Sequence, residues 1–150
     1  MGKLGDFFPG HEKQKHVAGH LEPGQVLCLF CEFTTPQKDK YLVLACPGER
    51  SLFFVINSQI PEFAQARKAL RSCQIKLSVS DYPFLDHDSY ANCAEVRVVS
   101  KAEIERQLLN DVGRIKGKLN ATTRKRIVKV VQSAKTISKE HKKLIVEALK

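Results

Sequence analysis

Residues 25–33 (QVLCLFCEF), 41–46 (YLVLAC) and 52–57 (LFFVIN) are three short apolar runs that decide the fold. Each is rich in branched or aromatic side chains, and Pro36, Pro47 and Gly48 separate them. Runs of this length with tight connections are typical of buried β-strands. Three such strands in succession predict an antiparallel meander.

The chain continues with weaker strand signals. Residues 59–72 predict a helical or irregular crossing, after which Ile75, Leu77 and Val79 alternate with polar residues. Such alternation is typical of a half-exposed strand. Residues 81–89 (DYPFLDHDS) predict a polar loop, and residues 90–99 predict one further strand.

The last third of the chain has a helical pattern. Ser100 and Glu103 have the spacing of a capping box, in which the serine hydroxyl accepts from the backbone three residues on and the glutamate reaches back. From this cap to the C-terminus we expect helices only, with apolar stripes that need another surface to cover them. About five strands followed by about three helices define an α+β fold.

The domain organisation is simple. The length of 150 residues and the absence of repeats favour one domain over residues 23–150, preceded by an N-terminal arm over residues 1–22. No apolar run approaches the ~20 residues that span a bilayer, and the N-terminus lacks the apolar stretch of a signal peptide. We therefore expect a cytoplasmic protein that does not bind membranes.

The positive charge is concentrated in the C-terminal third. Residues 1–100 hold 11 basic and 11 acidic side chains, whereas residues 101–150 hold 14 basic and 5 acidic ones, which accounts for the whole net charge of +9. A field of one sign favours a polyanion such as RNA, or an acidic protein partner. A solvated basic helical surface is the alternative.

The five cysteines are expected to be reduced thiols, because four of them lie within apolar strand-like runs. Cys28 and Cys31 have a spacing that zinc sites use, and His16 and His20 could supply two more ligands. Residues three apart on a strand point to opposite faces, however, so the two sulfurs would diverge unless the segment is a turn. We therefore expect no metal, and we expect no cofactor of another kind.

Several local strings, in this order, resemble the MazF, Kid and PemK family of bacterial toxins. The resemblance spans about residues 23–135 and rests on residues 24–27 (GQVL), 40–44 (KYLVL), 55–58 (VINS), 85–90 (LDHDSY), 95–99 (EVRVV) and 112–115 (VGRI). The arginine-proline that this family carries at the second strand is replaced by Asp39-Lys40 or Lys40-Tyr41. Another family arginine falls on Asn92.

The resemblance implies a small SH3-like antiparallel β-barrel with C-terminal helices. It also implies a homodimeric toxin of a type II toxin-antitoxin system, held inactive by a cognate acidic antitoxin. The implied activity is metal-independent endoribonuclease cleavage of single-stranded RNA, which leaves a 2′,3′-cyclic phosphate.

Cleavage of this kind needs a base, an acid and cationic or hydrogen-bonding groups on the phosphate. The imidazole of His87 is suited to act as base or acid, Asp88 is placed to orient it, and Ser89 to donate to a phosphate. The alternative is an exposed loop in which the two aspartates make turns and His87 has no role.

Lys40 begins a buried strand, where a flexible cation could reach across the mouth of a barrel to a phosphate. Asn57 and Ser58 end an intensely apolar strand, so they either close a turn before Pro61 or hydrogen-bond RNA. We therefore assign Lys40, Ser58, His87 and Asp88 to catalysis. The predicted RNA-binding residues are Thr34, Thr35, Asn57, Ser89, Asn92, Arg97, Arg124 and Arg126.

Three functions are open for these residues. The first is the endoribonuclease toxin. The second is a binding module that kept the barrel and lost the chemistry, because the family arginines are replaced. A subunit that binds only proteins is a third reading, and it would show no affinity for RNA.

Overall fold

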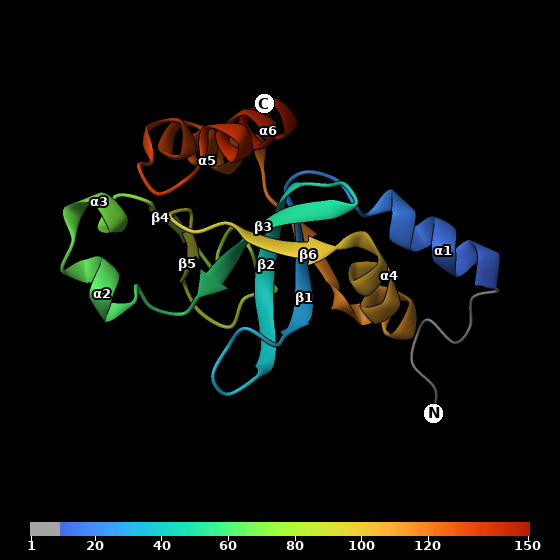
Figure 1. Ribbon diagram of the computed structural model, residues 1–150. Coiled ribbons are helices and arrows are strands. Elements are labelled where there is room, and N and C mark those ends of the chain that lie inside the picture. The colour runs from blue at the N-terminus through green and yellow to red at the C-terminus, as the bar shows by residue number, and fades with distance from the viewer. Residues whose placement is uncertain (1–9) are drawn as a thin grey trace.

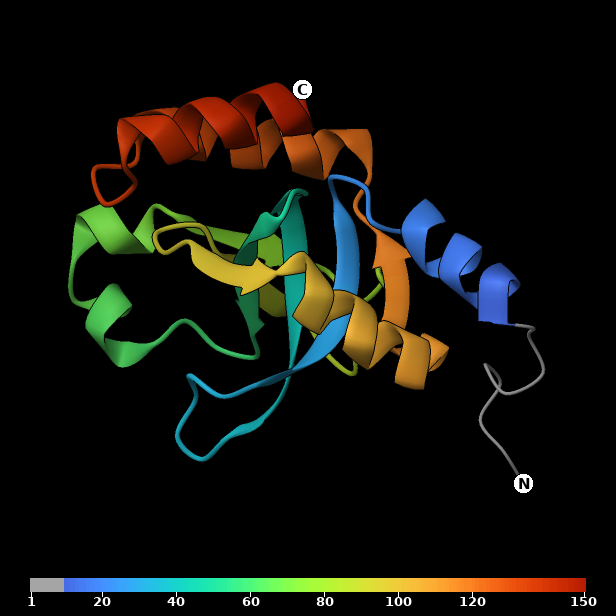
Figure 2. The ribbon, with the colours of Figure 1, turned by 45° about the vertical axis from the view of Figure 1, so that its right-hand side comes forward.

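The three apolar runs form the predicted antiparallel meander, in a computed structural model that describes residues 10–150 (Figures 1 and 2). The strands are β1 (Gln25–Cys31), β2 (Lys38–Cys46) and β3 (Arg50–Asn57). The prediction of an α+β fold with an antiparallel sheet and C-terminal helices is confirmed.

Apart from polar residues at their ends, these strands are apolar because both faces of the meander are buried. Val26, Val43 and Phe54 point into one core, whereas the adjacent residues Leu27 and Leu42 point into a second core on the other face. Successive side chains of a strand alternate between faces, so burial on both faces requires an unbroken apolar run.

Within residues 10–150 the sheet has seven strands, in the order β4-β5-β3-β2-β1-β7, with β6 also paired to β3. The additional strands are β4 (Gln74–Leu77), β5 (Ser89–Asn92), β6 (Arg97–Ser100) and β7 (Ile115–Lys118). β5 pairs with the end of β3 and β6 pairs with its beginning. The sheet therefore forks along β3 and curls into a half-barrel (Figure 1).

Helices cover both faces of the curled sheet (Figure 2). One core is closed by α1 (Gly10–Gly19), α4 (Lys101–Asn110) and the 3-10 helix η2 (Val112–Arg114). The other core is closed by α5 (Ala121–Ser133) and α6 (Lys139–Leu149). Two short helices, α2 (Glu62–Gln65) and α3 (Lys68–Arg71), form the predicted crossing.

The predicted cap of α4 is present in its first half. The Ser100 hydroxyl accepts from the Glu103 backbone N–H at 3.2 Å. The Glu103 carboxylate does not reach back, because Arg106 and Gln107 hold it. Asn120 caps α5 in the same way, its side chain accepting from Thr123 at 2.8 Å.

Two predictions of secondary structure are wrong. Residues 115–118 form strand β7 instead of a helix, because the open edge of β1 offers backbone partners to Ile115 and Lys118. The single strand predicted over residues 90–99 is divided into β5 and β6 by a turn, because the chain must pass from one end of β3 to the other.

The N-terminal arm lies partly outside the described residues, which begin at Gly10. Its described part forms α1, and Val17 of this helix is buried in the core beneath α4. No helix among residues 10–150 is long and apolar enough to cross a membrane.

The cysteines are free thiols, and Cys31, Cys73 and Cys93 are buried. Burial raises the pKa of each of these three thiols, which keeps them protonated. Cys28 faces a surface pocket, whereas Cys31 belongs to the core on the other side of β1. Within the described residues, no group of three or more His, Cys, Asp or Glu side chains is arranged to hold a metal ion.

Gly24 lies just before β1 and hydrogen-bonds to β2 and to the residue after β7. We expect Gly24→Ala to lower the free energy of unfolding by about 1–2 kcal/mol. Its N–H donates to Leu44, its carbonyl accepts from Leu119, and its φ of +89° strains any residue with a Cβ. An added Cβ would also lie 3.0 Å from Arg124. Urea unfolding measures the change, with Gly48→Ala as the matched control because its Cβ makes only ordinary contacts. Equal midpoints for the two variants would contradict this account.

Candidate active site

The strand register brings three separate segments to one edge of the sheet. Tyr41 of β2 pairs with Ile56 of β3, and the next residue, Asn57, pairs with Tyr90 of β5. The start of β2, the end of β3 and the loop before β5 therefore meet, at the lower edge of the sheet in Figure 1.

A pocket of about 370 Å³ opens at this edge, and we call it the His87 pocket. It brings together four residues predicted from the sequence, which are Lys40, Ser58, His87 and Ser89. These residues come from three segments, so only the folded sheet could collect them. A base, a cation and two hydroxyl groups are thus present in one cavity.

The ring of His87 is held by its own loop. Its Nδ1 lies 3.0 Å from the backbone carbonyl of Asp88, and a carbonyl only accepts, so Nδ1 carries the proton in this contact. In the neutral ring, Nε2 then holds the lone pair and can accept a proton. The buried Ser89 hydroxyl donates to the His87 carbonyl at 3.1 Å and fixes the same turn.

The Lys40 ammonium is the half-buried cation of the pocket. Its Nζ donates to the Asn57 side-chain oxygen at 2.8 Å. Burial lowers the pKa of Lys40 from its ordinary value of 10.5, and repulsion from Lys38 lowers it further. A desolvated ammonium bound to a neutral amide retains a strong attraction for a phosphate anion.

A second pocket of about 190 Å³ adjoins the first, and we call it the Arg97 pocket. Lys40 lines both pockets, while Asn57 and Ser58, adjacent in sequence, line one each. The predicted RNA-binding residues that it collects are Thr34, Asn57, Asn92 and Arg97. A strand of RNA passing over Lys40 would therefore meet both pockets.

Thr34 and Thr35 differ in placement within the loop between β1 and β2. The Thr34 hydroxyl is within hydrogen-bonding distance of the Cys31 and Pro36 carbonyls and accepts from the Lys38 N–H, so it organises the loop. Thr35 is exposed on the loop and lies outside the lining of both pockets.

The Asp88 carboxylate is held by residues other than His87. It accepts from the Val79 N–H at 2.9 Å and pairs with Lys76 at 3.5 Å. The Val79 hydrogen bond, with a smaller effect of Lys76, lowers the pKa of Asp88. The contact that orients the imidazole comes from the backbone of Asp88 instead.

Arg124 and Arg126 lie on α5, apart from the two pockets. The Arg124 side chain packs on Gly24 at the start of β1, whereas Lys40 pairs with Leu29 toward the other end of that strand. Arg126 donates to the Lys76 carbonyl at 3.5 Å. The two arginines could hold a longer RNA only beyond the pockets.

Sequence reasoning missed Tyr41 and the ion pair between Asp39 and Arg114. Tyr41 lines the His87 pocket, and Phe84 packs edge-on against its ring. Arg114 pairs with Asp39 at 3.1 Å and donates to the Cys28 carbonyl, which ties η2 to β1 and β2. Tyr41 follows Lys40 directly, and this adjacency was the available signal. Arg114 stood within the string at residues 112–115 (VGRI), but no role was assigned to it.

Comparisons with protein-family models and with curated protein sequences find no match for this chain. Comparison with solved structures shows a MazF-like fold. One similar structure is that of the Mycobacterium tuberculosis toxin MazF-mt6, with a TM-score of 0.53 and 9% sequence identity. The similar region covers 76% of this chain and 98% of that toxin. At this identity the likeness concerns the fold alone.

Proposed function

We propose that this chain is a metal-independent endoribonuclease that cuts single-stranded RNA in the His87 pocket. The observation that carries the proposal is that Lys40, Ser58, His87 and Ser89 converge on one pocket of a MazF-like fold. Each of the groups that RNA transesterification requires has a candidate there.

The proposed reaction needs only a proton acceptor, a proton donor and charge stabilisation. Nε2 of His87 takes the proton of the RNA 2′-hydroxyl, and the 2′-oxygen forms a bond to phosphorus. The bond from phosphorus to the 5′-oxygen breaks, which leaves a 2′,3′-cyclic phosphate. The Lys40 ammonium neutralises the phosphate and gives a proton to the departing 5′-oxygen, for which its lowered pKa suits it.

The remaining parts of the proposal follow the resemblance to the toxin family. The chain would act as a cytoplasmic homodimer, and an acidic antitoxin protein would hold it inactive. An acidic partner suits the net charge of +9. A small acidic protein encoded beside this chain that forms a stable complex with it would support the toxin role.

Incubation of the purified protein with a long single-stranded RNA in EDTA tests the proposed activity. We expect discrete cuts whose upstream products end in a cyclic phosphate. RNA that stays intact after long incubation would contradict the proposal.

The alternative is a nucleic-acid binding module without cleavage activity. It is favoured by Asn92, which stands at the place of a family arginine and is engaged by Gln74 in the structure. Such a protein would bind RNA with an affinity that falls steeply with salt and would leave the RNA intact.

A further inference from the structure

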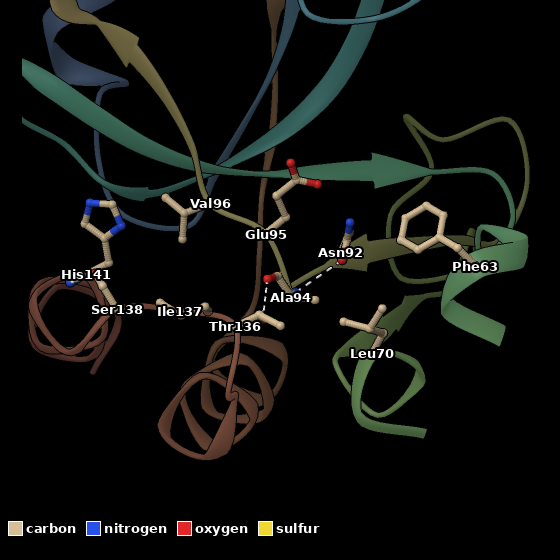
Figure 3. Close-up of a pocket in the computed structure, with 10 residues that line it drawn as sticks. All are labelled: Phe63, Leu70, Asn92, Ala94, Glu95, Val96, Thr136, Ile137, Ser138 and His141. Carbon is tan, nitrogen blue, oxygen red and sulfur yellow. Dashed lines mark hydrogen bonds between the residues drawn. The ribbon is translucent and has the colours of Figure 1, made fainter. Parts of the chain in front are cut away.

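A third pocket of about 480 Å³ lies beyond the Arg97 pocket, and we call it the His141 pocket (Figure 3). Phe63, Asn92 and Glu95 line both of these pockets, so they form the rim between them. The rim thus combines an aromatic ring, an amide and a carboxylate. In Figure 3 the Asn92 amide lies between the Glu95 carboxylate and the Phe63 ring.

Asn92 presents a fixed hydrogen-bond donor at this rim. Its side chain is only 8% exposed, and its oxygen accepts from Gln74 Nε2 at 2.9 Å and from the Ala94 N–H at 3.2 Å. These two donors set the orientation of the amide. Within residues 10–150 its nitrogen has no hydrogen-bond partner, and Figure 3 shows it on the opposite side of the amide from the bonded oxygen. Asn92 lines both pockets, so this donor is available at their rim.

Glu95 presents a fixed acceptor beside it. Arg97 holds the Glu95 carboxylate at 2.8 Å, and the same guanidinium lies 4.3 Å over the ring of Phe33. This contact restrains the carboxylate and leaves lone pairs on both oxygens for a ligand. The Phe63 ring, 60% exposed, offers a flat face next to these two groups.

We propose that Phe63, Asn92 and Glu95 form a subsite for an unpaired guanine base of the RNA, an inference that rests on the proposed function. Guanine places two adjacent donors, N1–H and the 2-amino group, next to the acceptor O6. The donors match the two oxygens of the Glu95 carboxylate, and O6 matches the Asn92 amide nitrogen. Adenine, cytosine and uracil lack the pair of adjacent donors. Unpaired bases are commonly bound by stacking on an aromatic ring and by their Watson–Crick edge.

Binding of RNA analogues that cannot be cut tests the subsite separately from cleavage. The probes are short oligouridines with one central purine and 2′-fluoro sugars, which lack the attacking hydroxyl. We expect the guanine probe to bind about tenfold more tightly than the adenine probe. Hypoxanthine should fall between them, because it lacks the 2-amino group.

Two exposed positions supply the variants. Glu95→Gln should remove the preference for guanine, because an amide cannot accept from both donors. Phe63→Ala should weaken the binding of all probes by a similar factor, since stacking does not depend on the base. Glu147→Gln on α6 is the matched control and should bind as the wild type does. Equal binding of guanine and adenine by the wild type, or a preference retained in Glu95→Gln, overturns the subsite.

The outcomes separate the subsite from the proposed activity. If the protein cuts long RNA but shows no guanine preference, the subsite is wrong and the endoribonuclease stands. If it prefers guanine and leaves RNA intact, the subsite stands and the endoribonuclease fails. If none of the probes binds and RNA stays intact, both proposals are wrong.

Discussion

Replacing His87 with alanine is expected to lower the rate of RNA cleavage by about a hundredfold to ten-thousandfold, the usual contribution of a general base. The variant should fold normally, because His87 is exposed and the hydrogen bonds of its ring within residues 10–150 go only to its sequence neighbours Asp88 and Ser89. Single-turnover cleavage of a defined RNA measures the loss, and circular dichroism checks the fold.

The controls for His87 distinguish chemistry from general damage. His20→Ala, on the turn that follows α1, should cut RNA at the wild-type rate. Binding of the uncleavable oligonucleotides should be nearly unchanged in His87→Ala, because a general base acts on the transition state. A His87→Ala protein that cleaves as fast as the wild type would remove this residue from the mechanism.

Lys40→Ala should lower the cleavage rate by about a hundredfold to a thousandfold, the effect of losing one group that stabilises developing charge. It should also weaken RNA binding, because the ammonium attracts the phosphate in the ground state. Lys129→Ala removes an exposed lysine of α5 and is the control for lost charge. Similar losses in the two variants would show that only the overall field matters.

Lys40→Arg separates the two roles proposed for the ammonium. Arginine keeps the charge at all relevant pH values but does not give up a proton. We therefore expect Lys40→Arg to bind RNA more tightly than Lys40→Ala does, but to cleave it more slowly than the wild type. Wild-type cleavage by Lys40→Arg would show that Lys40 supplies charge alone.

The lowered pKa of Lys40 predicts an alkaline limit on RNA binding. The charged form is lost as pH rises through a value below 10.5, so binding should fall earlier than for an ordinary lysine. Titration of probe affinity with pH measures this, and the fall should begin at a lower pH in the wild type than in Lys40→Arg. The free energy of unfolding should change with pH in the opposite sense to RNA binding. The reason is that the folded state binds the Lys40 proton less tightly than the unfolded chain does. Its contribution to stability therefore improves as pH rises through that window.

Part of the site could be predicted because its residues stand where polar groups interrupt apolar strands. Lys40 begins such a strand and Ser58 follows another, so their types at these places pointed to a role. His87 stood in a polar loop between strands. The partners of the Asp88 carboxylate could not be predicted from the sequence. They are Val79 and Lys76, and the packing of the loop against β4 brings them to Asp88.

The helical prediction for residues 115–118 shows where local pattern is insufficient. The intrinsic propensities of Ile115 and Lys118 do not strongly oppose a strand. The segment forms a strand because the open edge of β1 provides hydrogen-bond partners for its backbone. The same limit applies to Arg97 and Phe33. Their contact joins β6 to the loop after β1, and no spacing in the sequence encodes it.

The sequence by itself determined the fold class, the meander, the Ser100 cap of α4 and the segregation of basic charge. These features depend on local hydrogen bonding and on which side chains avoid water, and both are readable residue by residue. Only the tertiary structure decided that Lys40, Ser58, His87 and Ser89 share one pocket and that Phe63, Asn92 and Glu95 share a rim. Register and curl place residues of distant segments together, because strand pairing acts between segments that the sequence separates.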